Sequence, residues 1–203
     1  MPSQALIKFT GLMGNAKHLV DQAAKLKKKS DTAAKSIFLH AALAAYTAAW
    51  DAYIKALAED YYTSTTNATD TSYNHLHLIA KARMNAAKSK LNTPNSENCR
   101  TFLSDYTGFD PWPNWANAGR FAGRPGSSLH AQTRLNEIFK VRHSFAHGFT
   151  MPIYSWNQDS SGAAKLNCKG LREIENFFTS LTKETDKGMS GHVATQHGKP
   201  PPW

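Results

Sequence analysis

Apolar residues recur at steps of three and four along most of the chain, which is the spacing of one face of an α-helix. No segment shows a convincing alternation of apolar and polar residues of the kind that marks a half-buried strand. The stripes predict an all-α fold, a bundle of four main helices with shorter extra ones. The predicted helices cover residues 3–27, 30–62, 73–91, 95–106, 127–146 and 169–187.

The stripes also predict which side chains face the core. In the segment 73–91 they direct Leu76, Ile79 or Ala80, and Met84 inward. Such residues should be covered by neighbouring helices in the folded chain.

The helical pattern stops between residues 108 and 126. Three prolines and four glycines in this stretch exclude a regular helix, so it should form a long loop. Trp112 and Trp115 lie in the loop, and we expect them to anchor it to the bundle; the alternative is that they stack on nucleic-acid bases.

With 203 residues, the chain is long enough for one well-cored domain and short for two. We expect residues 1–187 to form that domain, with a basic helix at residues 1–29 packed on the rest. Residues 188–203 are rich in glycine, histidine and proline, so we expect a flexible C-terminal tail. The apolar runs are too short to span a bilayer, and the N-terminus shows no secretory leader pattern, so we expect a cytoplasmic protein.

The chain is basic, with 24 lysines and arginines against 15 aspartates and glutamates. Residues 1–50 hold seven lysines and two aspartates, including the run Lys27 to Lys29. Such a surface attracts phosphate backbones, although a lysine run at this place can also be a solvated helix end. An anionic partner is therefore expected.

The segment 127–146 carries a charge where its stripe requires an apolar residue. Leu135, Ile138 and Phe145 follow at helical steps, and Arg142 occupies the place of the next core residue. A lone buried charge is costly, so this guanidinium needs a partner, which an external anion can supply.

Two histidines follow on the same helix. His143 and His147 are four residues apart and therefore on one side, and Gly148 ends the helix. An imidazole can donate or accept a proton near neutral pH. Arg142 and His147 lie about 140° apart around an ideal helix axis, so a frayed last turn or a second protomer must bring them together.

The string VRHSFAHG at residues 141–148, preceded by RLNEI at 134–138, resembles the R-x4-H signature of HEPN domains, α-helical ribonucleases of bacterial conflict systems. Residues 38–42 and 50–53 of the long alanine-rich helix, and the segment 92–98, look most like the RiboL-PSP branch. The resemblance covers roughly residues 30–187.

The resemblance implies a metal-independent endoribonuclease without a cofactor, in which Arg142 and His147 of two protomers line one cleft of a homodimer. RNA brings its own nucleophile, the 2′-hydroxyl, so the protein has to move protons and stabilise charge on the phosphoryl oxygens. His147 is then the general base or acid, Arg142 holds the phosphate, and His143 orients the phosphate or shares the proton transfer. The products carry 2′,3′-cyclic phosphate and 5′-hydroxyl ends.

By the same resemblance, the protein is expected to be a toxin of a bacterial antiviral defence or abortive-infection system. An antitoxin, a sensor or a partner subunit would hold it in check. Asp51 is a candidate supporting acid that pairs with Arg142 or fixes an imidazole tautomer. Its alternative is a solvated position in a salt link to Lys55.

Other interpretations of these residues stay open. Arg142 can form an inter-helix salt bridge, and His147 can cap a helix C-terminus. His143 and His147 have a spacing that zinc accepts, with His75 and His77 as further ligands, although no carboxylate or thiolate run completes the set. The chain can also be a HEPN-like module that binds RNA or nucleotide without cutting it, a regulatory partner, or a scaffold without a nucleic-acid role.

Overall fold

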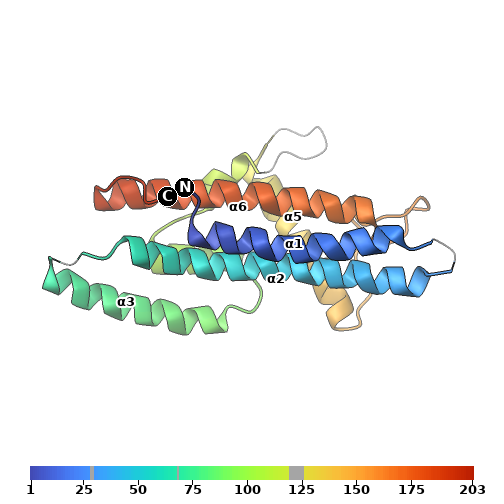
Figure 1. Ribbon diagram of the computed structural model, residues 1–203, viewed down its shortest axis with the longest axis horizontal. Coiled ribbons are helices and arrows are strands. Elements are labelled where there is room, and N and C mark those ends of the chain that lie inside the picture. The colour runs from blue at the N-terminus through green and yellow to red at the C-terminus, as the bar shows by residue number, and fades with distance from the viewer. Residues whose placement is uncertain (28–29, 68, 119–125) are drawn as a thin grey trace.

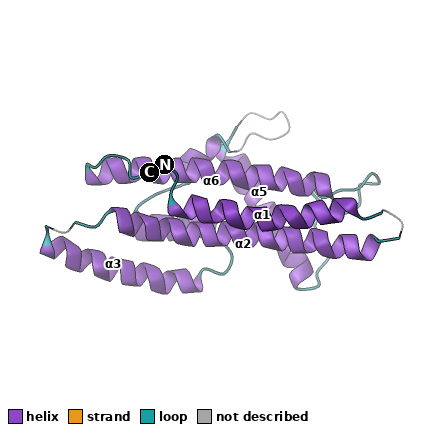
Figure 2. Ribbon diagram, viewed as in Figure 1, coloured by secondary structure: helices purple, strands orange, loops and turns teal. Residues whose placement is uncertain are grey.

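The computed structural model describes the chain from residue 1 to residue 203 except residues 28–29, 68 and 119–125. Its described residues form helices joined by loops and contain no strand, which confirms the all-α prediction (Figures 1 and 2). The helices are α1 (Gln4–Lys25), α2 (Thr32–Ser64), α3 (Thr71–Lys90), α4 (Ser96–Thr107), the 3-10 helix η1 (Trp112–Ala116), α5 (Ser128–Ala146) and α6 (Cys168–His197).

Helix α2 is the centre of the bundle. It has 33 residues, which corresponds to a length of about 50 Å, and α1 and α6 run along it (Figure 1). Alanine and larger apolar residues occupy all sides of α2, as expected for a helix that is covered by others around its circumference. Helices α1, α3, α4, α5 and α6 all contact it.

Hydrogen bonds from buried tryptophans tie outer segments to α2 and α6. The indole of Trp50 donates to the carbonyl of Pro94 at 2.9 Å, which holds the start of α4 against α2. The indole of Trp115 donates to the hydroxyl of Thr185 at 2.9 Å and is fully buried. Trp115 therefore anchors its loop to α6 as predicted. Residues 119–125 of the predicted long loop lie outside the described residues.

The last helix is longer than the sequence pattern predicts. The predicted helix ends near Lys187 and leaves residues 188–203 as a flexible tail, whereas α6 continues to His197. Met189 and Val193 are fully buried and extend the apolar face of α6 by two turns. The predicted tail is wrong for residues 188–197, because this buried face keeps them helical although glycine and histidine favour loops.

The buried face of α3 also differs from the prediction. Met84 is fully buried as expected, and Ala80, the stated alternative to Ile79, is half-buried against the core, but Leu76 is 70% exposed and Ile79 is 54% exposed. The residue that turns inward one position after Leu76 is His77. Helix α3 lies along the C-terminal half of α2 at the edge of the bundle, where no other helix covers its outer side (Figure 1). In the described part of the chain, no helix has the length and apolar character needed to cross a membrane.

Candidate functional site

The R-x4-H segment forms the C-terminal end of α5. The amide of His147 still donates to the carbonyl of His143 at 3.1 Å, so the last turn is not frayed. Gly148 then adopts a left-handed conformation with φ of 69°, which residues with a side chain avoid. The amide of Phe149 donates back to the carbonyl of Ser144 at 2.7 Å, a Schellman-type helix end.

This helix end gathers three rings on the surface. The imidazoles of His143 and His147 lie 4.1 Å apart, measured between ring centroids. The ring of Phe149, which is 64% exposed, folds back to 5.9 Å from His143 and 6.0 Å from His147. Both imidazoles are exposed, so a solvent-borne substrate can reach their nitrogens.

Arg142 lies beside this cluster at the edge of the core. The sequence pattern placed it in the core stripe of α5, but the structure gives that place to Val141, which is fully buried, because Val141 follows Ile138 by three residues. Arg142 is half-buried, and it makes no ion pair or hydrogen bond with any of the described residues. The salt-bridge alternative for Arg142 is therefore not observed in the described part of the chain.

A single chain does not bring the arginine and the distal histidine together. The intact last turn keeps Arg142 and His147 about 140° apart around the helix axis. His147 instead stacks on His143, which follows Arg142 directly. The hydrogen bond from the His147 amide to the carbonyl of His143 shows that fraying of the helix does not close this gap.

Asp51 lies away from this cluster. Its carboxylate pairs with Lys55 at 2.8 Å, which is the salt link of the stated alternative, but the residue is half-buried and not solvated, and its Oδ1 is buried without a hydrogen-bond partner among the described residues. Helix α2 meets the end of α5 at His40, whose ring is 4.7 Å from that of Phe145. Asp51 is about 16 Å further along α2, and the contacts of the described residues do not join it to Arg142.

Comparison with family models identifies the family of this chain. The model of the RiboL-PSP-HEPN family matches residues 15–190. The chain belongs to the RiboL-PSP-HEPN family. This confirms the resemblance that the R-x4-H segment predicts. Neither the search of curated proteins nor that of solved structures gives a match.

Membership of this family indicates the chemistry that is expected of the site. HEPN-family domains are generally ribonucleases, so RNA is the substrate class of the family. The matched residues include α5 with its two exposed histidines and with Arg142, which pairs with none of the described residues. The candidate site of this RiboL-PSP-HEPN domain is therefore the end of α5.

One residue beside the site was missed by sequence reasoning. His40 of α2 is half-buried, and its Nε2 is buried without a hydrogen-bond partner. Burial lowers the pKa of His40 below 6.5, although a hydrogen bond to Ser36 opposes the shift. Its contact with Phe145 links it to the RiboL-PSP-HEPN site, and the sequence signal that includes it is the segment 38–42, which resembles the RiboL-PSP branch.

The zinc alternative finds no support in the geometry of the domain. No three His, Cys, Asp or Glu side chains of the described chain come close enough to hold a metal ion together. His77 is on α3, where its Nε2 lies 3.1 Å from the hydroxyl of Thr65, and His75 is on the same helix. Helix α3 flanks the other half of α2 (Figure 1).

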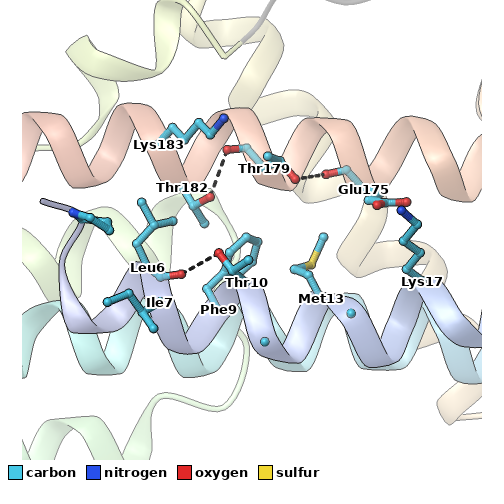
Figure 3. A pocket seen from close by; sticks show the side chains of 13 residues that line it. Leu6, Ile7, Phe9, Thr10, Met13, Lys17, Glu175, Thr179, Thr182 and Lys183 are labelled. Atoms are coloured by element: carbon cyan, nitrogen blue, oxygen red, sulfur yellow. Dashed lines mark hydrogen bonds between the residues drawn. The ribbon is translucent and has the colours of Figure 1, made fainter.

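A groove of about 600 Å³ with a mostly apolar lining lies between α1 and α6. Figure 3 shows the hydroxyls of its three threonines bonded within their own helices. Thr10, Thr179 and Thr182 each donate to a backbone carbonyl one turn earlier, at 2.8 to 2.9 Å. Since specific ligand sites need a few converging polar groups that are free to bind, we assign no ligand to this groove.

Proposed function

We propose that this RiboL-PSP-HEPN domain is a metal-independent endoribonuclease whose catalytic residues are Arg142, His143 and His147. The observation that carries the proposal is that half-buried Arg142 has no counter-ion among the described residues and directly precedes His143, whose exposed imidazole packs on that of His147. A phosphodiester supplies the missing negative charge. A planar guanidinium can hold two phosphoryl oxygens at once.

The chemistry follows from these groups. One imidazole accepts the proton of the 2′-hydroxyl, and the 2′-oxygen attacks the adjacent phosphorus. The bond from phosphorus to the 5′-oxygen breaks, and a protonated imidazole donates to that oxygen. Arg142 stabilises the charge that develops on the phosphoryl oxygens. The RNA is left with a 2′,3′-cyclic phosphate on one side and a 5′-hydroxyl on the other.

A homodimer completes the site in this proposal. Arg142 and His147 diverge on one helix, whereas a twofold axis beside the end of α5 can set the arginine of one protomer opposite the histidine of the other. Exposed apolar side chains accompany the motif. Phe149 follows it, Ile153 comes four residues later, and Ile37 is one turn before His40 on α2. Such residues suit a protein–protein contact better than water.

The first experiment is RNA cleavage by purified protein in excess chelator. We expect the wild type to cut, and His147→Ala and Arg142→Ala to lose cutting while they keep much of the RNA affinity. His18→Ala is the matched control, because His18 is an exposed histidine of α1 that contacts Gln22. RNA ends other than cyclic phosphate and 5′-hydroxyl contradict the mechanism. Binding without cutting supports the alternative, a HEPN-like module that binds RNA or serves as a regulatory partner.

The dimer is tested by mixing two inactive variants. When Arg142→Ala and His147→Ala proteins are mixed, each mixed dimer retains one intact pair of the two that the symmetry generates. Random mixing makes half of the dimers mixed, so activity should recover to about a quarter of wild type. A site contained in one chain gives no recovery. The biological setting proposed is a bacterial defence or toxin–antitoxin system, with an antitoxin or a sensor protein as the further partner.

A further inference from the structure

A second groove lies far from the end of α5. It has a volume of about 630 Å³, and the end of α2, α3, the end of α4 and the end of α6 form its walls. Aromatic and imidazole rings line it, namely Tyr61, Tyr62, Tyr73, His77, Tyr106, His192 and His197. The neighbouring rings lie 5.2 to 6.2 Å apart, for example His77 at 5.2 Å from Tyr62 and 5.6 Å from Tyr73.

Hydrogen bonds to backbone carbonyls fix several of these rings in place. The hydroxyl of Tyr62 donates to the carbonyl of Tyr106 at 2.6 Å, and that of Tyr73 donates to the carbonyl of Thr65 at 2.7 Å. Nε2 of His192 lies 2.9 Å from the carbonyl of Thr107, and it must donate because a carbonyl only accepts. Tyr62 and His77 are buried, so the rings that remain partly exposed to a ligand are Tyr61, Tyr73, Tyr106, His192 and His197. The hydrogen bonds hold this wall in place before any ligand arrives, which reduces the entropy lost on binding.

A third groove of about 660 Å³ continues the second one along α3. The two share Tyr62, Leu76, Ala80, Asp105 and Tyr106, so they form one channel, which we call the α3 channel. The continuation adds the basic side chains Arg83 and Lys90, both of which are exposed.

The α3 channel is positively charged along one wall. Arg83 and Lys90 of helix α3 line it, whereas the other two basic residues of this helix, Lys81 and Lys88, lie outside the lining, and α3 has no acidic residue. Lys88 pairs with Glu59, and the other three have no ion pair within the described chain. This positive charge acts on the imidazoles beside it. The pKa of His77 is lowered mainly by burial and further by Lys81. Burial and then Lys199 do the same to the pKa of His197.

We propose that the α3 channel binds single-stranded RNA as an exosite of the nuclease. A basic wall that follows the phosphates, facing aromatic rings on which bases stack, is how proteins hold single strands without reading their sequence. The exposed carboxylate of Asp105 lies in the channel and can accept hydrogen bonds from base amino groups.

The exosite rests on the proposed ribonuclease function. Its distance from the cutting site allows it to hold one part of a strand while another part is cut. His40 contacts the end of α5, and Tyr61 lines the channel on the same continuous helix, about 32 Å further along. A strand held in the channel presents a distant phosphodiester to Arg142 and His147. The enzyme thereby prefers long unpaired RNA over short fragments, including its own short products.

The test measures RNA affinity of the full chain in a non-cutting His147→Ala background, by fluorescence anisotropy with a single strand of about 16 nucleotides. Arg83→Gln combined with Lys90→Gln should weaken binding about tenfold. The slope of log affinity against log salt should fall by about 1.4, since each phosphate contact on a single strand contributes about 0.7. Lys8→Gln combined with Lys187→Gln removes the same charge from exposed positions outside the channel and is the matched control.

The ring wall is tested separately. Tyr106→Leu removes a ring that both grooves share and keeps an apolar contact for Phe102, so folding should be preserved. A 2-aminopurine in the RNA should be quenched on binding to the parent protein and less so on binding to this variant. Unchanged affinity in both variants overturns the exosite, as it would if the channel served a protein partner. Since affinity is read without cleavage, that result leaves the nuclease proposal standing, and a protein that binds but never cuts leaves the exosite standing.

Discussion

The most direct test of the site geometry is Gly148→Ala. Gly148 has φ of 69°, and a methyl group at its Cα would meet no atom within 4 Å. The substitution therefore costs only backbone strain, about 1 to 2 kcal/mol for a residue with a side chain in the left-handed region. For a chain of this size, that corresponds to a melting temperature lower by roughly 2 to 8 °C. The protein stays folded, because domains have about 5 to 15 kcal/mol of stability.

The loss of activity should be larger than this loss of stability predicts. To relieve the strain, the backbone at Gly148 has to leave the left-handed region, and the amide of Phe149 then leaves the carbonyl of Ser144. The rings of Phe149, His143 and His147 lose their common packing. A displacement of about 1 Å at a reacting group can cost about a hundredfold in rate, so we expect cleavage to slow tenfold to a hundredfold.

Gly162→Ala is the matched control. Gly162 has φ of 83°, its Cβ would also meet no atom within 4 Å, and it contributes nothing to the site. It should lose similar stability and keep the wild-type rate of single-turnover cleavage at saturating protein. Gly148→Asn should recover part of the rate, since asparagine tolerates the left-handed region. Wild-type cleavage by Gly148→Ala, or equal losses in both alanine variants, would refute the reasoning.

Three further predictions concern charge, packing and titration. Arg142→Ala should slow single-turnover cleavage about 10²- to 10³-fold and change stability by less than about 0.5 kcal/mol, because no ion pair with described residues is lost. Gly170→Ala places a methyl 1.9 Å from the carbonyl oxygen of Trp156 and should cost roughly 1 to 3 kcal/mol in urea unfolding. On the same helix, Gly191→Ala meets nothing and should stabilise by about 1 kcal/mol. His40 should titrate below 6.5 in NMR, so its contribution to stability is complete above that pH and is lost as pH falls through the lowered pKa; a value of 6.5 or above contradicts its burial.

The helices could be located from sequence because their signals are local. The predicted segment 127–146 and the observed α5 (Ser128–Ala146) agree within one residue, since apolar periodicity sets the helix and Gly148 ends it. For residues 188–197 the local sequence gives the wrong prediction, a tail in place of a helix. Their composition favours loops, but the buried side chains of Met189 and Val193 outweigh it, and burial by distant segments cannot be seen in a local pattern.

The candidate site also has one part that local sequence predicts and another that it does not. Arg142, His143, His147 and the turn at Gly148 belong to one helix end, so their spacing alone indicates which of them can meet. A partnership between Asp51 and Arg142 depends on how α2 and α5 are aligned, and the contact of His40 with Phe145 sets that alignment about three turns away from Asp51. Sequence periodicity carries no information on alignment between helices, so this pairing could only be guessed.

Helix α3 is the clearest case of a helix that the sequence predicts while its buried face is not predicted. Periodicity correctly groups Leu76, Ile79 and Met84 among the apolar residues of one helix, but it does not say what covers them. The other helices already surround α2, and the room left beside its C-terminal half accommodates only the side of α3 that holds Met84 and His77. The apolar residues left in water border the channel wall that also carries Arg83 and Lys90. Because so little of α3 is buried, substitutions on its outer side should change RNA binding far more than they change folding.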